Sequence, residues 1–573
     1  MSKGHRFVAV NLVFLSFFIF TGKGFCQAPS SQTAGGITRQ EKDIEKKRDI
    51  EKKIKAQKST GVQATEKEVI PEDSGPKVTV NTIAVEGATL IDEAAIKQIT
   101  AGYEGKALSF KSIQKIADLI TDEYRKKGYV TSRAYIPPQT VKSGSLIIRV
   151  VEGKLGTMEV KGNKYFKTSV LEKKINVSHD GYFDYSALQR SLVYINEHPD
   201  RQAKAVIVPG KAPGTTDVVI DVTDRLPLHA GFTYDNYASR YLERNRYSLF
   251  FENNNLLGFD DKLYVKISEA EANRMHLQQG RYSLFLQEDF EIGAYLVNSR
   301  TRLGKEFKDL DAKGKAQIYG IFLNNQLLRK DNLDLRLTCG FDYKNVKNYL
   351  AGEQTSKDMV RLLKLGLDAD ITDVWGRTII TPEIGQGLPD FMGGMDDKDP
   401  GASRAGAGGK FTKFNFNAFR LQALPYSTTL LWKNSGQFTN NALVASEQFQ
   451  IGGPISVRGY GPAEFSGDRG FYTSPELSFP IYCVPKDLKV PFSDVTIYDS
   501  NRLVLFYDWA TTRLETPQAG EKKNETIRGW GFGWRFTLKD NLTCRVELGY
   551  PLGKKTPADG DHAHTWVEVT AKF

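Results

Sequence analysis

From about residue 226 to the end of the chain, apolar and polar residues alternate along many short segments. In residues 333–344, apolar or aromatic positions alternate with polar, charged or glycine positions along the whole segment. Residues 530–538 and 542–550 show the same alternation on the two sides of a three-residue connection. Because side chains of a β-strand point to opposite faces in turn, this pattern predicts strands with one apolar and one polar face.

Water-soluble β-sandwiches and membrane barrels both contain strands of this kind. Three features favour a barrel: predicted strands of about ten residues, apolar faces rich in aromatic residues, and polar inserts of variable length. At roughly 20 to 22 residues per strand and connection, about 348 residues predict a transmembrane antiparallel β-barrel of about sixteen strands. After the N-terminal segment no stretch approaches about 18 consecutive apolar residues, so only a barrel could cross a membrane.

The residues before the barrel predict two α+β units of the same build, strand–helix–helix–strand–strand. In the first unit the strands are predicted over 77–87, 129–137 and 144–153, and the helices over 92–100 and 109–128. In the second unit the strands are predicted over 154–162, 202–210 and 215–224, and the helices over 167–175 and 183–199. Ser109 is the predicted N-cap of the longer first-unit helix, and Gly128 its stop signal. Such a repeat is typical of a small helix-on-sheet module.

Three further segments precede these units. Residues 1–26 have a basic start, an apolar run over residues 7–20 and small or polar residues after it, which is the form of a secretory signal peptide. Within residues 27–58, the segment 38–57 is rich in Glu, Lys and Arg, with Ile44, Ile50 and Ile54 as a thin apolar stripe. This segment is predicted to be either a solvated helix or a disordered basic tail. Residues 59–77 contain glycine and proline and are a predicted linker.

Composition and residue spacing argue against several functional classes. The chain has 573 residues and a formal charge of +10, but its basic residues are interleaved with acidic ones, which argues against nucleic acid as a partner. Its four cysteines and seven histidines show no metal-ligand spacing and no disulfide framework. No nucleophile elbow or phosphate-binding loop is recognisable. We therefore predict no enzyme, no catalytic residues, no metal and no cofactor.

One arginine stands out in a glycine-rich stretch, "PISVRGYG", that is expected to be a loop. Alternation in "RLVLFYDWATT" places Asp508 on the polar face of a strand, pointing into the barrel lumen. A guanidinium is the best bidentate partner for a carboxylate, so Arg458 is a candidate partner of Asp508. The alternative is an exposed turn arginine and an unrelated luminal aspartate.

Motifs in order along nearly the whole chain resemble the TpsB-type transporters of two-partner secretion, the hemolysin secretion/activation family of the POTRA-plus-barrel superfamily. "YRKKGYVTSRAYIPPQTVKSGSLIIRVVEG" resembles the end of the first POTRA domain of that family, and "NEHPDRQAKAVIVPGKAPGTTDVVIDV" the end of the second. "FTYDNYASRYLERNRYSLFFENNNLLGFDD" resembles the entry into the barrel. "VRGY" and "GDRGFY" resemble the sixth extracellular loop and the strand after it.

The resemblance assigns candidate site residues. In that family the arginine of VRGY folds into the lumen and pairs with the aspartate of an F-x-D-x-G strand motif. The loop motif in this chain comprises Val457, Arg458, Gly459 and Tyr460, and the strand motif Phe506, Asp508 and Ala510, with alanine in place of the family's glycine. The motif of the following strand comprises Gly467, Asp468, Arg469 and Gly470. The terminal Phe573 resembles the assembly signal of outer-membrane barrels.

The resemblance also implies a domain order and a function. The implied order is a signal peptide (1–26), a plug-like helix region (27–58), a linker (59–77), two POTRA domains (78–153 and 154–225) and the barrel (226–573). The implied function is export of a large unfolded exoprotein of adhesin, hemolysin or contact-toxin type. Periplasmic POTRA domains would bind this client, and it would cross the outer membrane without ATP. Outer-membrane lipid and the barrel assembly machinery are further implied partners. The alternatives are a barrel insertase of the same architecture and, third, a passive porin.

Overall fold

The computed structural model describes residues 30–55 and 77–573, apart from residues 140, 142, 143, 178–180, 213, 288, 331 and 540. The predicted signal peptide and nearly all of the predicted linker lie outside the described residues. The chain forms two compact units. One contains the barrel strands together with the N-terminal helix, and the other contains residues 58–227 and the short turn 254–260.

The second of these units contains two modules with the predicted strand–helix–helix–strand–strand order. The first module consists of β2 (Thr82–Glu86), α3 (Glu93–Thr100), α4 (Phe110–Lys126), β4 (Arg133–Tyr135) and β5 (Ser145–Val151). The second consists of β6 (Lys154–Lys161), α5 (Thr168–Glu172), α6 (Tyr185–Asn196), β7 (Arg201–Pro209) and β8 (Thr215–Asp224). Their sheets have the orders β2-β5-β4 and β6-β8-β7. In the first sheet β2 pairs in parallel with β5, and in the second β6 pairs in parallel with β8. The predicted repeat is confirmed.

The first module departs from the predicted strands at two places. The strand predicted over 77–87 is two strands, β1 (Lys77–Val80) and β2, because the amides of Asn81 and Thr82 both donate to the Gly144 carbonyl. β1 pairs instead with β3 (Lys106–Ser109), a strand that the pattern did not predict. The strand predicted over 129–137 shortens to β4 because the residues before it form tight turns.

Helix α4 has the predicted ends. The Ser109 hydroxyl accepts a hydrogen bond from the Ser112 amide at 3.2 Å, which is an N-cap, and Gly128 follows the helix at φ 91°. The helix buries one face against the β-sheet; the buried residues of this core are Val80, Ile91, Ile96, Leu108, Ile113, Ile116, Ala117, Ile120, Tyr124, Ala134, Leu146, Ile148 and Val150.

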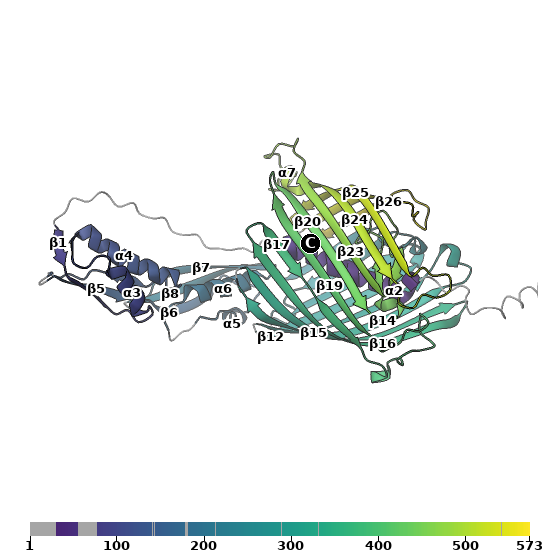
Figure 1. Cartoon of the computed structure of the whole chain (residues 1–573), viewed down its shortest axis with the longest axis horizontal. Coiled ribbons are helices and arrows are strands. Elements are labelled where there is room, and N and C mark those ends of the chain that lie inside the picture. Colours follow the sequence, from purple (N-terminus) through teal and green to yellow (C-terminus); the bar gives the residue numbers. More distant parts are fainter. Residues whose placement is uncertain are drawn as a thin grey trace, which may run out of the picture. The chain divides into compact units, whose positions relative to one another are not determined.

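The other unit contains a closed antiparallel barrel (Figure 1). Its strands are β9 (Leu228–Asp235), β10 (Arg246–Asn253), β11 (Lys262–Ala270), β12 (Met275–Gln287), β13 (Phe290–Arg302), β14 (Lys313–Arg329), β15 (Leu333–Leu350), β16 (Glu353–Asp373), β17 (Gly376–Ile380), β18 (Glu383–Gly387), β19 (Thr412–Leu424), β20 (Thr428–Thr439), β23 (Arg469–Pro480), β24 (Asn501–Arg513), β25 (Asn524–Leu538), β26 (Leu542–Leu552) and β27 (His564–Lys572). β17 and β18 both pair with β16 and β19, so they are two parts of one strand interrupted at Pro382, which has no amide hydrogen. The barrel therefore has sixteen strands in the described part of the chain, as predicted.

The barrel closes where β27 pairs with β9. Beyond the last paired residues, the amide of Phe573 donates to the Ala230 carbonyl at 2.8 Å, and the Ala230 amide donates to the Phe573 carbonyl at 3.2 Å. The Phe573 side chain is 80% exposed on the outside of the barrel. Outward-facing apolar residues such as Leu505 and Trp530 are also exposed, whereas the luminal Asp508 is buried, so the two faces are as the alternation predicted.

The remaining elements are helical or lie in loops. β21 (Phe449–Ile451) and β22 (Phe465–Gly467) form a small hairpin in the long connection between β20 and β23, and α7 (Ile497–Ser500) precedes β24. Helix α2 (Ala34–Lys55) lies inside the barrel (Figure 1). It begins four residues before the charge-rich segment 38–57. Of the two states predicted for that segment, helix or disordered tail, the structure has the helix. Within the described residues no helix is long and apolar enough to span a membrane.

The first module has a polar hub at Glu152. Its carboxylate accepts hydrogen bonds from the Thr89 and Leu90 amides at 2.6 and 2.8 Å and from the Tyr124 hydroxyl at 2.6 Å. Partial burial raises the pKa of Glu152, but the hydrogen bonds from Thr89 and Tyr124 outweigh burial, and the pKa lies below its ordinary value. The carboxylate therefore stabilises the module fully above the ordinary pKa of 4.5 that it has in the unfolded chain. This stabilisation is lost as the pH falls through the lower pKa of the folded state.

We predict that Glu152→Ala loosens the segment after β2, because the Thr89 and Leu90 amides lose their acceptor. Hydrogen–deuterium exchange of the full-length protein should show faster exchange over residues 87–92. The control is Glu86→Ala, since Glu86 forms only an exposed pair with Arg149 and should change exchange little. In the wild type, protection of the same residues, corrected for intrinsic rates, should fall below about pH 4.5. Unchanged exchange in Glu152→Ala would contradict this account.

Candidate functional site in the barrel lumen

The connection between β20 and β23, residues 440–468, folds back into the lumen. Its turn is tight: the Gly453 amide donates to the carbonyls of both Val457 and Tyr460, at 3.2 and 3.0 Å. Gly453 has φ 92°, a conformation that side chains other than glycine's rarely adopt. Val457 and Tyr460 are completely buried, and Arg458 is 1% exposed. The loop therefore presents an arginine to the interior of the barrel.

Arg458 meets Asp508 of β24 through three donors. Its Nε donates to Oδ2 at 2.9 Å, its second guanidinium nitrogen donates to Oδ1 at 2.9 Å, and its backbone amide donates to Oδ2 at 3.0 Å. The Ser474 hydroxyl also donates to Asp508 Oδ1, at 2.7 Å. The structure thus brings the two residues together as a bidentate pair, and the exposed-turn alternative does not describe it.

Two further carboxylates surround the guanidinium, and the sequence did not single them out. Its remaining nitrogen donates to Glu476 of β23 and Glu547 of β26, both at 3.0 Å. Arg535 of β25 bonds the same two glutamates, so four adjacent strands contribute to one buried cluster of charges. Strand alternation had placed Arg535 and Glu547 on the luminal face. Alternation alone could therefore have identified them as luminal charged residues, but it could not have shown that they lie beside Arg458.

Further contacts hold the loop against the barrel wall. The Trp566 indole donates to the Arg458 carbonyl at 2.8 Å, and the guanidinium carbon lies 3.2 Å from the centroid of the Phe506 ring. At Gly549 a Cβ atom would lie 2.4 Å from the Arg458 carbonyl oxygen, and at Gly459 one would lie 2.5 Å from Pro551 N. Only glycine at these positions lets the loop lie against β26.

Ala510, which differs from the family's glycine, is accommodated in an apolar cluster. Its methyl group is fully buried, and the buried members of this cluster are Phe449, Ile451, Val457, Tyr460, Tyr472, Ala510 and Ile527. The Tyr460 hydroxyl donates to the Lys555 carbonyl at 3.0 Å, beyond the cluster. The residue that breaks the motif thus adds packing between the loop and the wall.

The motif Gly467–Gly470, which follows the loop, makes hydrogen bonds and close contacts with the segments around Leu443 and Glu515. Asp468 is fully buried and accepts hydrogen bonds from the Leu443 amide at 2.9 Å and from the Glu515 amide at 2.8 Å. Arg469 pairs with Glu515 at 2.7 Å. Gly467 and Gly470 lie where a Cβ atom would meet the Arg513 backbone and the Phe449 ring, at 2.8 and 2.1 Å. These residues position the loop and do not contact Arg458.

Helix α2 is joined to the barrel wall by ion pairs on two sides, in addition to its apolar contacts. On one side Glu41 pairs with Arg246 of β10 and Glu45 with Lys266 of β11 at 3.1 Å, and Arg48 on the same side pairs with Glu568 of β27. On the other side the helix lysines meet wall carboxylates; these pairs are Lys42–Asp342 at 3.2 Å, Lys46–Glu383 at 3.8 Å and Lys53–Asp370 at 3.4 Å. This charge pattern fixes the rotation of the helix about its axis.

The helix also reaches the Arg458 cluster. Glu51 accepts hydrogen bonds from Lys433 at 3.3 Å and Arg545 at 3.0 Å. Lys433 also donates to Glu476 at 3.3 Å, and Glu476 is a partner of Arg458. A continuous chain of charged contacts therefore joins α2 to the loop.

One group in the described residues has the spacing of metal ligands: Asp559, Asp561 and His564. Arg244 bonds both aspartates, at 2.8 and 2.9 Å, and His564 lies 2.9 Å from Asp559. The Arg244 guanidinium therefore already provides the positive charge that a metal ion would supply to these aspartates.

Comparisons with known proteins agree with this architecture. The "Haemolysin secretion/activation protein ShlB/FhaC/HecB" family matches residues 214–536, and the "POTRA domain, ShlB-type" family matches residues 78–153. "Outer membrane transporter CdiB" of Dickeya dadantii is 24% identical over 421 residues, 72% of this chain and 74% of that protein. "Heme/hemopexin transporter protein HuxB" of Haemophilus influenzae is 23% identical over 499 residues, 84% of each chain.

Solved structures share the fold. CdiB from Escherichia coli has a TM-score of 0.73 and 20% identity, covering 96% of this chain and all of that chain. BamA from Haemophilus ducreyi lacking POTRA domains 1–3 has a TM-score of 0.54 and 13% identity, covering 87% of this chain and all of that one. The family match covers more than half of the chain, so this protein belongs to the haemolysin secretion/activation (ShlB/FhaC/HecB) family of outer-membrane proteins, with POTRA domains in the periplasm.

Proposed function

We propose that the protein exports one large unfolded exoprotein, of adhesin, hemolysin or contact-toxin type, through the lumen of its barrel. The observation that carries this proposal is that the lumen is occupied by two segments, α2 and the loop bearing Arg458, and that ion pairs join both of them to the barrel wall. Charged contacts can be exchanged for water or for another polar chain, whereas an apolar core cannot. A lumen closed in this way can be opened for passage.

Arg458 acts in this proposal as the lock of the loop. It is 1% exposed and balances three carboxylates, so removing it leaves uncompensated buried charges. Val457, Gly459 and Tyr460 support the lock by packing, and Phe506 provides the ring beneath the guanidinium.

The region 27–58 acts as the plug. Ile50 and Ile54 pack on Ile379, Phe419 and Leu431 of the wall, and near the start of the helix Ile37 and Ala34 pack in two further apolar clusters. Between these contacts the helix bonds the wall through charged side chains, which water can replace when the segment leaves the lumen. Residues 1–26 act as the signal peptide, and residues 59–77 as the linker between the plug and the first POTRA domain.

The POTRA domains, 78–153 and 154–225, receive the client by adding its strands to a sheet edge. β7 supports this role, because among the described strands it is an edge strand paired with β8, and it exposes Val206, Ile207 and Val208 in succession. Pairing through the main chain depends little on client sequence, so it suits a long extended chain. Folding of the client outside the cell would drive export, and no ATP is needed. Phe573 would direct the barrel itself to the assembly machinery, and the exposed outer residues would contact lipid.

We predict that Arg458→Ala abolishes secretion of the client while the barrel still inserts. Cells lacking the wild-type gene but expressing the variant should lose one large protein from the culture supernatant, as cells without the protein do. The control is Arg420→Ala, which removes an arginine bound to the partly exposed Asp373 and should leave secretion unchanged. Wild-type secretion in Arg458→Ala would contradict the lock. Loss of many outer-membrane proteins on depletion would instead support the insertase alternative.

We also predict that reversing one plug charge opens the pore. Glu45→Lys places a cation against the buried Lys266, so α2 should leave the lumen and the conductance in planar bilayers should rise severalfold. Adding Lys266→Glu restores an opposite-charge pair with reversed polarity and should return the conductance toward the wild-type value. If the double variant conducted as much as the single one, α2 would not be held by this pair.

A further inference from the structure

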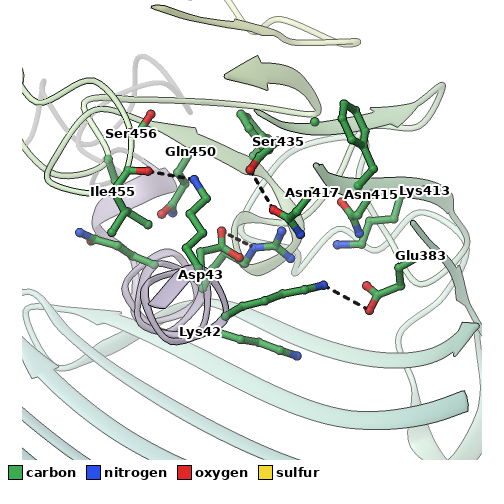
Figure 2. A pocket seen from close by; sticks show the side chains of 18 of the residues that line it. Lys42, Asp43, Glu383, Lys413, Asn415, Asn417, Ser435, Gln450, Ile455 and Ser456 are labelled. Atoms are coloured by element: carbon green, nitrogen blue, oxygen red, sulfur yellow. Dashed lines mark hydrogen bonds and ion pairs between the residues drawn. The ribbon is translucent and has the colours of Figure 1, made fainter. Parts of the chain in front are cut away.

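A partly open cavity lies between α2 and the barrel wall (Figure 2). Helix α2 forms one side, strands from β15 to β20 form the wall, and the loop around Ser456 forms the roof. Seven basic side chains line it: Arg39, Lys42, Lys46, Lys47, Lys344, Lys364 and Lys413. Only two carboxylates, Asp43 and Glu383, are among the lining residues in the described part of the chain.

The wall compensates only part of this positive charge. Asp342 is bonded by Lys42 and Lys364, and Glu447 is bonded by Lys344 and Lys413. With these two buried carboxylates included, basic groups exceed acidic groups by three around the cavity. Excess cations in an enclosed site are stabilised when an anion joins them, because water alone screens them less well there.

A second observation points to a ligand. Ser456 is 2% exposed and lines the cavity, and its hydroxyl has no hydrogen-bond partner. Lys47 reaches this region and donates to the Ile455 carbonyl at 3.0 Å. A buried hydroxyl without a partner costs free energy that a bound acceptor would recover.

We propose that this cavity binds a small soluble oxyanion of the phosphate class with at least two negative charges. Lys42 and Lys46 of α2 and Lys364 and Lys413 of the wall supply the charge, and the Ser456 hydroxyl donates one hydrogen bond. Phosphate-type oxyanions offer several strong acceptors to several ammonium groups at once. The closed strand wall separates the cavity from the lipid side of the barrel, so a water-soluble anion is the ligand and not a lipid headgroup.

This ligand would hold three parts together. It contacts the plug helix, the wall and the loop, so each bound anion stabilises the arrangement in which α2 occupies the lumen. The inference goes beyond the export of a client and does not depend on it, because binding requires only the arrangement of α2, wall and loop in the resting barrel.

The test uses the full-length detergent-solubilised protein and inorganic pyrophosphate. Isothermal titration should show saturable one-to-one binding that sodium chloride of equal ionic strength does not reproduce. Lys46→Gln should weaken binding about tenfold, since it removes one charged contact. Ser456→Ala should weaken it severalfold without disturbing the fold, because the Ser456 hydroxyl bonds no protein atom.

Lys53→Gln is the matched control. Lys53 lies on the same helix, is 44% exposed against 38% for Lys46, and pairs with a wall carboxylate in the same way, but it does not line the cavity. Its substitution should leave pyrophosphate binding unchanged. The proposal is overturned if the wild type shows no saturable binding, or if Lys53→Gln weakens binding as much as Lys46→Gln.

Discussion

The guanidinium of Arg458 is nearly fully buried, and its charge is balanced by carboxylates from three strands of the barrel wall. A buried charge is tolerated only when it is paired, and breaking such a pair typically costs about 3–5 kcal/mol. The position of the whole loop follows from this balance. The contact at Gly549, the indole bond of Trp566 and the apolar cluster around Ala510 all require the loop to be in place.

The same physical principle extends to α2. Charged residues of the helix face wall residues of opposite charge, as in the Glu45–Lys266, Lys42–Asp342 and Lys53–Asp370 pairs, so charge pairing aligns the helix together with its buried isoleucines. Glu51 joins the helix to the Arg458 cluster through Lys433 and Glu476. Displacing the helix therefore changes the electrostatic surroundings of the loop, and displacing the loop changes those of the helix. Two separable segments share one network of charges, which suits a pore that opens in a concerted way.

Much of this fold could be predicted from the sequence, because strand alternation is a local property. It identified the barrel, the strand number and the luminal face that carries Asp508. The partners of Arg458 could not be found in full, because they depend on the register of four strands and the path of a long loop. Glu476 and Glu547 both reach Arg458 only because β23, β24, β25 and β26 are neighbours in the sheet. The break of one strand at Pro382 and the separate pairing of β1 with β3 are also long-range outcomes.

The central claim is that Arg458 and Asp508 act as one unit that holds the loop in the lumen. Hydrogen–deuterium exchange over residues 452–461 in the wild type, Arg458→Ala, Asp508→Asn and the double variant tests it as a double-mutant cycle. Each single variant should lose protection in the loop, and the double variant should lose less than the two single losses added together, with a coupling of at least about 1.5 kcal/mol. Wild-type protection in both single variants, or losses that simply add, would contradict the account.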